Sequence, residues 1–219
     1  MPRLLFEKKG NAVWMSHLDL MRVFQRAFKR AGLPLTHTQG FNPRPSVSIA
    51  LPLSVGVESV CELLDFDLDG EAVPNEEICS KLNHALVDGV QVLQVYENGK
   101  KIRDLSLLHC QVTLEYDSGI PNNARVALQE LFSRKSLIVP KKSKNGMQEQ
   151  DIIPMLNNLE VIEAGECELV LDCVVCCQNP TLNPMQLVAA IALHQPVLKP
   201  DFAKCRRIEV FDKENNVFR

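Results

Sequence analysis

Two kinds of hydrophobic spacing alternate along the first half of the chain. Between His17 and Ala31, apolar side chains recur at steps of three and four residues, which is typical of a helix that buries one face. Ser16 supplies an N-cap before this segment, and Gly32 and Pro34 end it. Elsewhere in this half the pattern predicts one strand or a hairpin-like start at residues 3–8 and 11–15, strands at 46–52, 61–68 and 90–96, and a second helix at 74–86.

The second half of the chain repeats this order less regularly, after a polar joint at residues 98–101. The first half has the order β-α-β-β-α-β, which is the split βαβ pattern of a ferredoxin-like domain. We therefore predict an α+β protein with two tandem ferredoxin-like domains, at residues 1–98 and 105–219. In the second domain the expected elements are strands at 109–116, 136–140, 166–177 and 206–211, helices at 123–132 and 183–194, an exposed turn at 141–146 and a mixed segment at 151–162.

Charge is distributed unevenly along the chain, although the net charge is only −3. Residues 1–50 hold eight Lys or Arg against two acids, whereas residues 51–99 hold one Lys against ten acids. A near-neutral protein whose cations gather at one end is expected to meet an anionic partner there. No apolar run is long enough to span a bilayer, and the N-terminus lacks the features of a secretory signal. The sequence therefore predicts a cytoplasmic protein without a membrane partner, whose eight cysteines are thiols.

Cations lie along one side of the first predicted helix. Arg22, Arg26 and Lys29 or Arg30 are spaced by three or four residues, so they share the face opposite the apolar one. A ridge of cations at this spacing suits the phosphates of a nucleic-acid backbone. The alternative interpretation is a solvated helix face on which Asp19 pairs with Arg22.

A loop rich in Gly and Pro follows this helix, with the sequence Gln-Gly-Phe-Asn-Pro-Arg-Pro at residues 39–45. Because Gly permits backbone conformations that other residues resist, and Pro fixes φ, the loop is expected to be held in one shape. It would present Asn42 and Arg44 to a phosphate or a base edge, with Phe41 able to stack. The alternative makes Phe41 part of the core and Arg44 an ordinary surface residue. The candidate binding residues are Arg22, Arg26, Lys29, Arg30, Gly40, Phe41, Asn42 and Arg44.

His17 and His37 are the only candidates for catalysis that the pattern offers, since His is the usual general base and could cleave RNA without a metal. The sequence places no carboxylate or Tyr as a partner beside either of them. The helix dipole also disfavours the charged form of His17 in the first turn. No nucleotide-binding or hydrolase motif occurs in the chain. We therefore expect no catalytic residue, with His17 and His37 as the alternative.

Two groups of residues resemble metal ligands at first sight, and the pattern argues against both. Cys173 and Cys176-Cys177, with Cys167 six residues upstream, lie in an apolar, β-like run. Alternation along a strand separates their side chains, whereas a metal site normally places CxxC on a knuckle. The carboxylates at residues 62–71 alternate with apolar residues, which predicts a solvated acidic face. We therefore expect no metal and no cofactor. The other cysteines are isolated in the sequence and predict no site: Cys61, Cys79, Cys110 and Cys205.

Three motifs together resemble the radical SAM-linked family of uncharacterised bacterial proteins. They are Ser16-His-Leu-Asp-Leu20 with Arg22, Gly-Phe-Asn-Pro-Arg-Pro at 40–45, and Leu51-Pro-Leu53 with Gly56. Members of that family are fused to radical SAM enzymes or encoded beside them, and the family has no settled activity. The resemblance implies a partner for this chain, namely a separate radical SAM protein of the cobalamin-binding type. The chain lacks the CxxxCxxC signature of such enzymes, which implies a standalone accessory piece that binds neither an iron–sulfur cluster nor S-adenosylmethionine alone.

Three functions from different classes follow as alternatives. In the first, the chain is a non-catalytic accessory subunit that binds RNA or another phosphate-bearing substrate through the helix at 17–31 and the loop at 40–45. In the second, it is a metal-independent endoribonuclease of the tandem ferredoxin-like type, which rests on likeness of fold alone. In the third, it is purely a protein-interaction subunit that docks its partner through the acidic region at 58–77.

Overall fold

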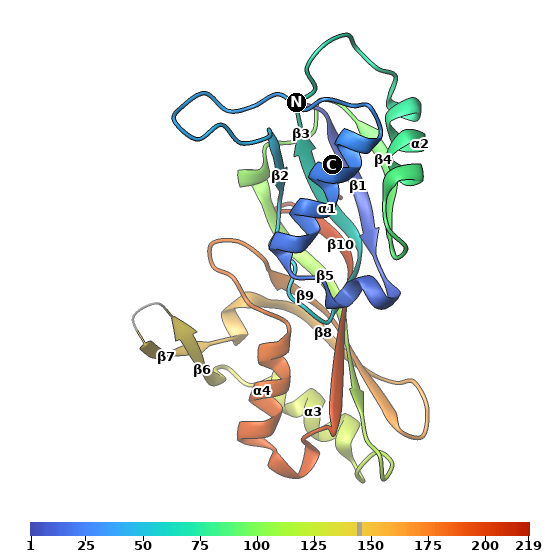
Figure 1. Cartoon of the computed structure of the whole chain (residues 1–219). Coiled ribbons are helices and arrows are strands. Elements are labelled where there is room, and N and C mark those ends of the chain that lie inside the picture. The colour runs from blue at the N-terminus through green and yellow to red at the C-terminus, as the bar shows by residue number, and fades with distance from the viewer. Residues whose placement is uncertain (144–145) are drawn as a thin grey trace. The chain divides into compact units, whose positions relative to one another are not determined.

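The chain is a mixed α+β protein with mainly antiparallel strand pairing and four α-helices, in a computed structural model that describes residues 1–143 and 146–219 (Figure 1). Two compact units divide it: residues 1–102 together with Arg219, and residues 103–218. The division falls inside the stretch 98–105 that lies between the two predicted domains. Among the residues described, none of the helices combines the length and apolar character that crossing a bilayer requires.

The N-terminal unit follows the order β-α-β-β-α-β along the chain. Its elements are β1 (Arg3–Lys8), α1 (His17–Arg30), β2 (Val47–Ile49), β3 (Val57–Phe66), α2 (Asn75–Ala85) and β4 (Val90–Tyr96). The strands lie in the order β4-β1-β3-β2, and each neighbouring pair is antiparallel. Two aromatic pairs pack α1 on this sheet: Phe24 on Phe6 and Phe28 on Phe66, with ring centroids 4.7 Å and 5.0 Å apart. The spacing of apolar residues therefore predicted the buried face of α1 correctly.

The prediction of a strand at residues 11–15 is wrong, because a short 3₁₀ helix occupies Gly10–Trp14. The cause lies in the fully buried Lys8, whose Nζ donates to the carbonyl oxygens of Val13 at 3.1 Å and Met15 at 3.3 Å. The backbone turns around this ammonium group, and these carbonyls are used there instead of in a strand ladder.

The C-terminal unit contains four long strands, two helices and a separate hairpin. Its elements are β5 (Leu105–Glu115), α3 (Ala124–Phe132), β6 (Ile138–Ser143), β7 (Gly146–Asp151), β8 (Leu156–Glu163), β9 (Glu168–Cys176), α4 (Met185–His194) and β10 (Phe202–Asp212). The strands of the main sheet lie in the order β10-β5-β9-β8 with antiparallel neighbours, and β6 pairs only with β7.

The region between α3 and β9 differs most from the sequence-based expectation. The exposed turn predicted at 141–146 is largely strand, since β6 continues to Ser143 and β7 begins at Gly146; the rest of that prediction, residues 144–145, lies outside the described residues. The mixed segment at 151–162 contains a 3₁₀ turn at Ile153–Met155 and then β8. The sequence around Lys141 is polar and lacks the alternation of apolar and polar residues that indicates a strand, so it carried no strand signal.

Three cysteines that are distant in sequence meet in the core of the C-terminal unit. Cys110 on β5 lies opposite Cys173 on β9, with their Sγ atoms 3.5 Å apart, and it also contacts Cys205 on β10. Cys110 and Cys205, which are isolated in the sequence, are therefore neighbours in space, because strand pairing brings them together. Hydrogen bonding to Cys173 raises the pKa of Cys110, hydrogen bonding to Cys110 raises the pKa of Cys205, and burial acts in the same direction. Thiols held in this protonated form behave as small apolar side chains.

Candidate functional site

The first turn of α1 is organised by a capping box. Ser16 accepts a hydrogen bond from the backbone N–H of Asp19 at 3.2 Å, and its hydroxyl donates to the Asp19 carboxylate at 2.7 Å. The same carboxylate accepts a hydrogen bond from Arg22 at 3.2 Å. The hydroxyl of Ser16, helped by the guanidinium of Arg22, lowers the pKa of Asp19 below its ordinary value. Arg22 is thus already engaged by a neighbour on its own helix, as the alternative interpretation of the basic face required.

The four cations predicted to share one face of α1 fall into two groups. Arg22 pairs with Asp19, and the guanidinium of Arg30 donates to the carbonyl oxygen of Ala85 at the end of α2. Arg26 and Lys29 are exposed and form no ion pair with any of the residues that the structure describes. The cations of α1 that remain available for a ligand are therefore Arg26 and Lys29.

The end of α1 adopts a Schellman motif that also shapes a pocket. Gly32 has a φ of +67°, a left-handed conformation that glycine adopts without the steric penalty of a Cβ. The N–H of Leu33 donates to the carbonyl oxygen of Phe28, and the N–H of Gly32 donates to that of Lys29. This motif commonly places an apolar contact between the residue after the glycine and the last turn of the helix. Leu33 and Phe28, which occupy those two positions, form the floor of the pocket.

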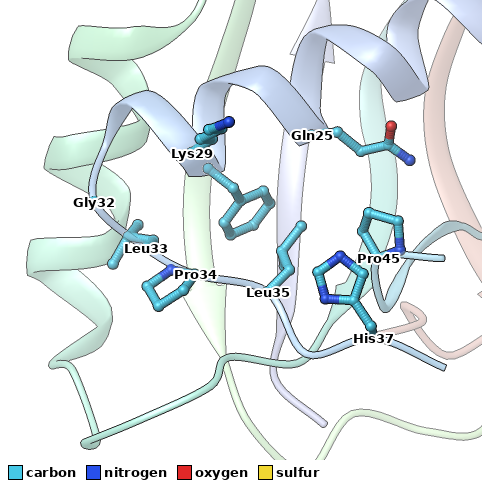
Figure 2. A pocket seen from close by; sticks show the side chains of 9 residues that line it. Gln25, Lys29, Gly32, Leu33, Pro34, Leu35, His37 and Pro45 are labelled. Atoms are coloured by element: carbon cyan, nitrogen blue, oxygen red, sulfur yellow. The ribbon is translucent and has the colours of Figure 1, made fainter. Parts of the chain in front are cut away.

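The pocket has a volume of about 410 Å³ and combines apolar walls with a polar rim (Figure 2). Gln25 and Lys29 reach it from α1, while His37 lies beside Pro45 at the end away from Gly32. Pro34 and Leu35 complete the apolar lining. A pocket of this size with one cation, one imidazole and one amide at its mouth suits a small ligand that has an apolar face and a negatively charged group.

Main-chain hydrogen bonds close the base of the loop that follows the pocket. The N–H of Thr38 donates to the carbonyl oxygen of Arg44 at 2.8 Å, and the N–H of Arg44 donates to the hydroxyl of Thr38 at 3.0 Å. One step further down, the N–H of Ser46 donates to the carbonyl oxygen of Thr36 at 2.8 Å. The loop projects from the N-terminal unit as the blue segment before β2 (Figure 1).

All the candidate residues of this loop lie on the surface. Phe41 is completely exposed, with a relative accessibility of 105%, so the interpretation of Phe41 as part of the core is wrong. Gly40, Asn42 and Arg44 are exposed as well, and the Arg44 side chain has no ion-pair partner within the described ranges. An aromatic side chain held fully in solvent by a closed loop loses the benefit of burial, and stacking on a ligand would restore it.

Of the two candidate histidines, His17 belongs to α1, whereas His37 lies on the segment that follows this helix. His17 begins the helix, and its Nδ1 is buried without a hydrogen-bond partner in the described part of the chain. His37 lines the pocket beside Gln25. Gln25 lies two turns after His17 on α1, or roughly 12 Å away along the helix axis. The structure therefore does not bring His17 and His37 together as an acid–base pair.

Three carboxylates of the predicted acidic face at 62–71 are engaged by neighbouring groups. Glu62 is buried, and Asp65 forms a two-pronged pair with the buried Arg3 through contacts of 2.5 Å and 3.1 Å. Asp67 accepts a hydrogen bond from the hydroxyl of Thr36 at 3.0 Å. These three carboxylates are therefore engaged inside the N-terminal unit, whereas Asp69, Glu71, Glu76 and Glu77 of the acidic region at 58–77 are exposed. In the part of the chain that the structure describes, no three His, Cys, Asp or Glu side chains gather as a possible metal site.

Sequence reasoning selected as candidates only two of the nine residues that line the pocket. It selected Lys29 as a binding residue and His37 only as a possible catalyst, and it did not select Gln25, Leu35 or Pro45. The available signal was the pair Gly32 and Pro34, which ends the helix and turns the chain back. What the sequence could not supply was the pairing of Leu35 with Leu68, which holds the returning segment along an extension of β3.

Comparisons with known proteins identify a family and a fold. A model of one family, described as an uncharacterised protein conserved in bacteria, matches residues 2–184. No curated protein matches the chain. A chain in the crystal structure of a Cbf5–Nop10–Gar1 complex is similar over 95% of this chain, with a TM-score of 0.50 and 9% sequence identity. This chain covers 48% of that one, so it spans about half its length, and the likeness shows the fold alone.

A second solved structure is more distant in shape. An unknown protein from Galdieria sulphuraria aligns with 94% of this chain and 96% of its own, at 13% identity and a TM-score of 0.26.

Proposed function

We propose that this chain, which belongs to the DUF2344 family of uncharacterised proteins conserved in bacteria, is a non-catalytic accessory subunit in the bacterial cytoplasm. In this role it binds RNA, or another phosphate-bearing substrate, and delivers it to a separate radical SAM enzyme of the cobalamin-binding type. The ligand-binding residues are the free cations of α1, the pocket beside them and the loop at 38–46.

One observation carries the RNA-binding part of the proposal: three cations of α1 and the following loop have no ion-pair partner among the described residues and either line the pocket or adjoin a lining residue in the chain. Within the described residues, Arg26, Lys29 and Arg44 are such cations, whereas Arg22 and Arg30 are engaged by neighbouring groups. Lys29 lines the pocket, Arg26 follows the lining residue Gln25, and Arg44 precedes the lining residue Pro45. Unpaired cations around an apolar pocket favour a ligand with phosphate groups and a ring system.

We further propose that both units are ferredoxin-like domains arranged in tandem. The strand orders β4-β1-β3-β2 and β10-β5-β9-β8 support this, since each places the first and third strands of its unit side by side in the centre. In each unit one helix connects the first strand to the second and another connects the third to the fourth, with the β6–β7 hairpin as an insertion in the C-terminal unit.

Replacing Arg26, Lys29 and Arg44 together by alanine tests the RNA-binding proposal. Each lost phosphate contact to a single strand should flatten the plot of log affinity against log salt by about 0.7 unit, so the triple variant should lose roughly two units of slope. The measurement is fluorescence anisotropy of a labelled short oligouridylate over a range of KCl concentrations. A variant with the same change in charge, Lys101→Ala with Arg103→Ala and Lys213→Ala, removes exposed cations outside the site and should keep the slope of the unchanged protein.

Equal salt slopes for the two triple variants would contradict the assignment of the site. The same RNA, incubated with the protein in EDTA, separates binding from catalysis. Intact RNA is expected, and cleavage that His37→Ala abolishes would favour the endoribonuclease alternative instead.

The proposed partner has its own test. Tagged protein purified from a bacterial host of the family should retain a radical SAM protein after nuclease treatment, because the association is expected to be protein-mediated. Mass spectrometry of the purified complex identifies the partner. Recovery of RNA-binding proteins alone, all lost after nuclease, would contradict the accessory role and leave an RNA-binding protein that acts by itself.

A further inference from the structure

The pocket beside α1 has the chemistry of a site for a flat ring. Leu33, Pro34, Leu35 and Pro45 supply apolar surface that a ring face can cover. Three different polar groups stand at the rim. They are the amide of Gln25, which both donates and accepts, the ammonium of Lys29, which only donates, and the imidazole of His37, which does either. A nucleobase has this combination of apolar faces and a mixed donor and acceptor edge.

The charges around the pocket match a strand that passes across it. Arg26 and Lys29 lie one turn apart on α1, and Arg44 lies on the loop beside the other wall. Phosphates on both sides of an inserted base would thus find a cation on either side. A long aliphatic ligand would use the apolar walls and leave these cations without counter-charges, so the charge distribution favours a nucleotide.

Phe41 adds a second place for a base. Its ring is fully exposed at the tip of a loop whose base is closed by hydrogen bonds between Thr38 and Arg44. An exposed aromatic ring on a fixed support is the usual stacking platform of proteins that bind single strands. The next base along the strand could stack there while its neighbour fills the pocket.

We propose that the pocket is a subsite for one unpaired nucleobase, with Phe41 as a platform for an adjacent base, so that the protein selects single-stranded over paired RNA. This inference rests on the proposed RNA-binding function. Bases in a duplex are stacked and paired, and their faces are not available to the pocket or to Phe41.

Three probes of equal length test this subsite by anisotropy competition: a short oligouridylate, the same backbone with abasic spacers at every position, and a duplex of the same strand. The intact strand is expected to bind about tenfold or more tightly than the abasic strand, since each stacked base contributes a substantial part of the affinity. The duplex should also bind more weakly than the intact strand. The double variant Gln25→Ala with His37→Ala should lower affinity for the intact strand several-fold and leave the abasic strand unaffected.

A matched variant separates this effect from a general loss of polar side chains. His84→Ala with Gln91→Ala removes an exposed histidine and an exposed glutamine from α2 and β4, and it should change binding of neither strand. Equal affinity for the intact and abasic strands, with a normal salt slope, would overturn the base subsite and leave the RNA-binding function standing. Absence of binding for all three probes would overturn the RNA-binding function and the subsite together.

Discussion

Replacement of Lys8 by methionine is expected to lower the free energy of unfolding of the N-terminal unit by about 3 to 5 kcal/mol. The side chain of Lys8 is fully buried, with a relative accessibility of 0%, and its ammonium group donates to the carbonyl oxygens of Val13 and Met15. Methionine fills a similar volume but cannot donate, so both carbonyls would lose a charge-assisted hydrogen bond in the interior. Lys8 also pairs in register with Ser59, whose hydroxyl donates to the buried Glu62. The substitution therefore removes a positive charge from a region that holds a buried carboxylate.

Urea unfolding followed by tryptophan fluorescence measures this change in the N-terminal unit. Trp14 is the single tryptophan of the chain and lies in the 3₁₀ helix that Lys8 supports. The control is Lys9→Met, because Lys9 is the neighbouring residue and pairs with Glu7 at a partly exposed site. That change should cost less than about 1 kcal/mol. A Lys8→Met protein that unfolds within 1 kcal/mol of the unchanged protein would contradict the role given to the buried ammonium group.

Substitution of Gly89 by alanine is expected to destabilise the N-terminal unit by roughly 3 kcal/mol or more. A Cβ at this position would lie 2.4 Å from the carbonyl oxygen of Lys9 and 2.8 Å from the Cβ of Ala12. Neither group can yield easily, because the N–H of Lys9 donates to the carbonyl oxygen of Gly89 at 2.7 Å and Ala12 is buried. The φ of +83° adds the ordinary penalty of a left-handed backbone for a residue with a side chain.

Gly70→Ala isolates the backbone penalty from the steric one. Gly70 has a φ of +102° in the same unit, and a Cβ there would meet open space. Its substitution should destabilise by about 1 to 2 kcal/mol, measured by the same fluorescence experiment. Equal losses for the two alanine variants would show that the close approach between Gly89 and the 3₁₀ helix does not contribute to stability.

Local signals in the sequence predicted the helix of the site well and the pocket only in part. The N-cap, the apolar stripe and the glycine stop of α1 act within a few residues of each other, so Ser16, Phe24 and Gly32 could be interpreted without knowledge of the fold. The exposure of Phe41 was left open, because a Phe in a Gly- and Pro-rich loop is compatible with either a core or a surface position. In the structure, Phe41 is fully exposed on a loop whose base is closed by hydrogen bonds between Thr38 and Arg44.

Polar residues used inside the fold account for the errors in the predicted distribution of charge. A count of charges along the sequence places Arg3 and Lys8 in a basic N-terminal region, whereas both side chains are buried and hydrogen-bonded in the structure. It likewise counts Asp65 as surface charge, although this residue neutralises Arg3. Such pairings depend on strand register over long separations, which hydrophobic periodicity does not encode. The positive charge that remains available is accordingly smaller and more localised than the composition indicates.

The Schellman motif that ends α1 couples ligand binding in the pocket to fraying of the helix, because both depend on the last turn of α1. The amide hydrogen of Leu33 exchanges with solvent only when its bond to the carbonyl oxygen of Phe28 opens, and that opening also removes the floor of the pocket. A ligand that binds the closed form must therefore slow exchange at this amide in proportion to its occupancy. The exchange rate of the Leu33 amide thus reports how the last turn of α1 and a bound molecule stabilise each other. It does so even for a ligand that binds too weakly to alter the unfolding of the whole unit.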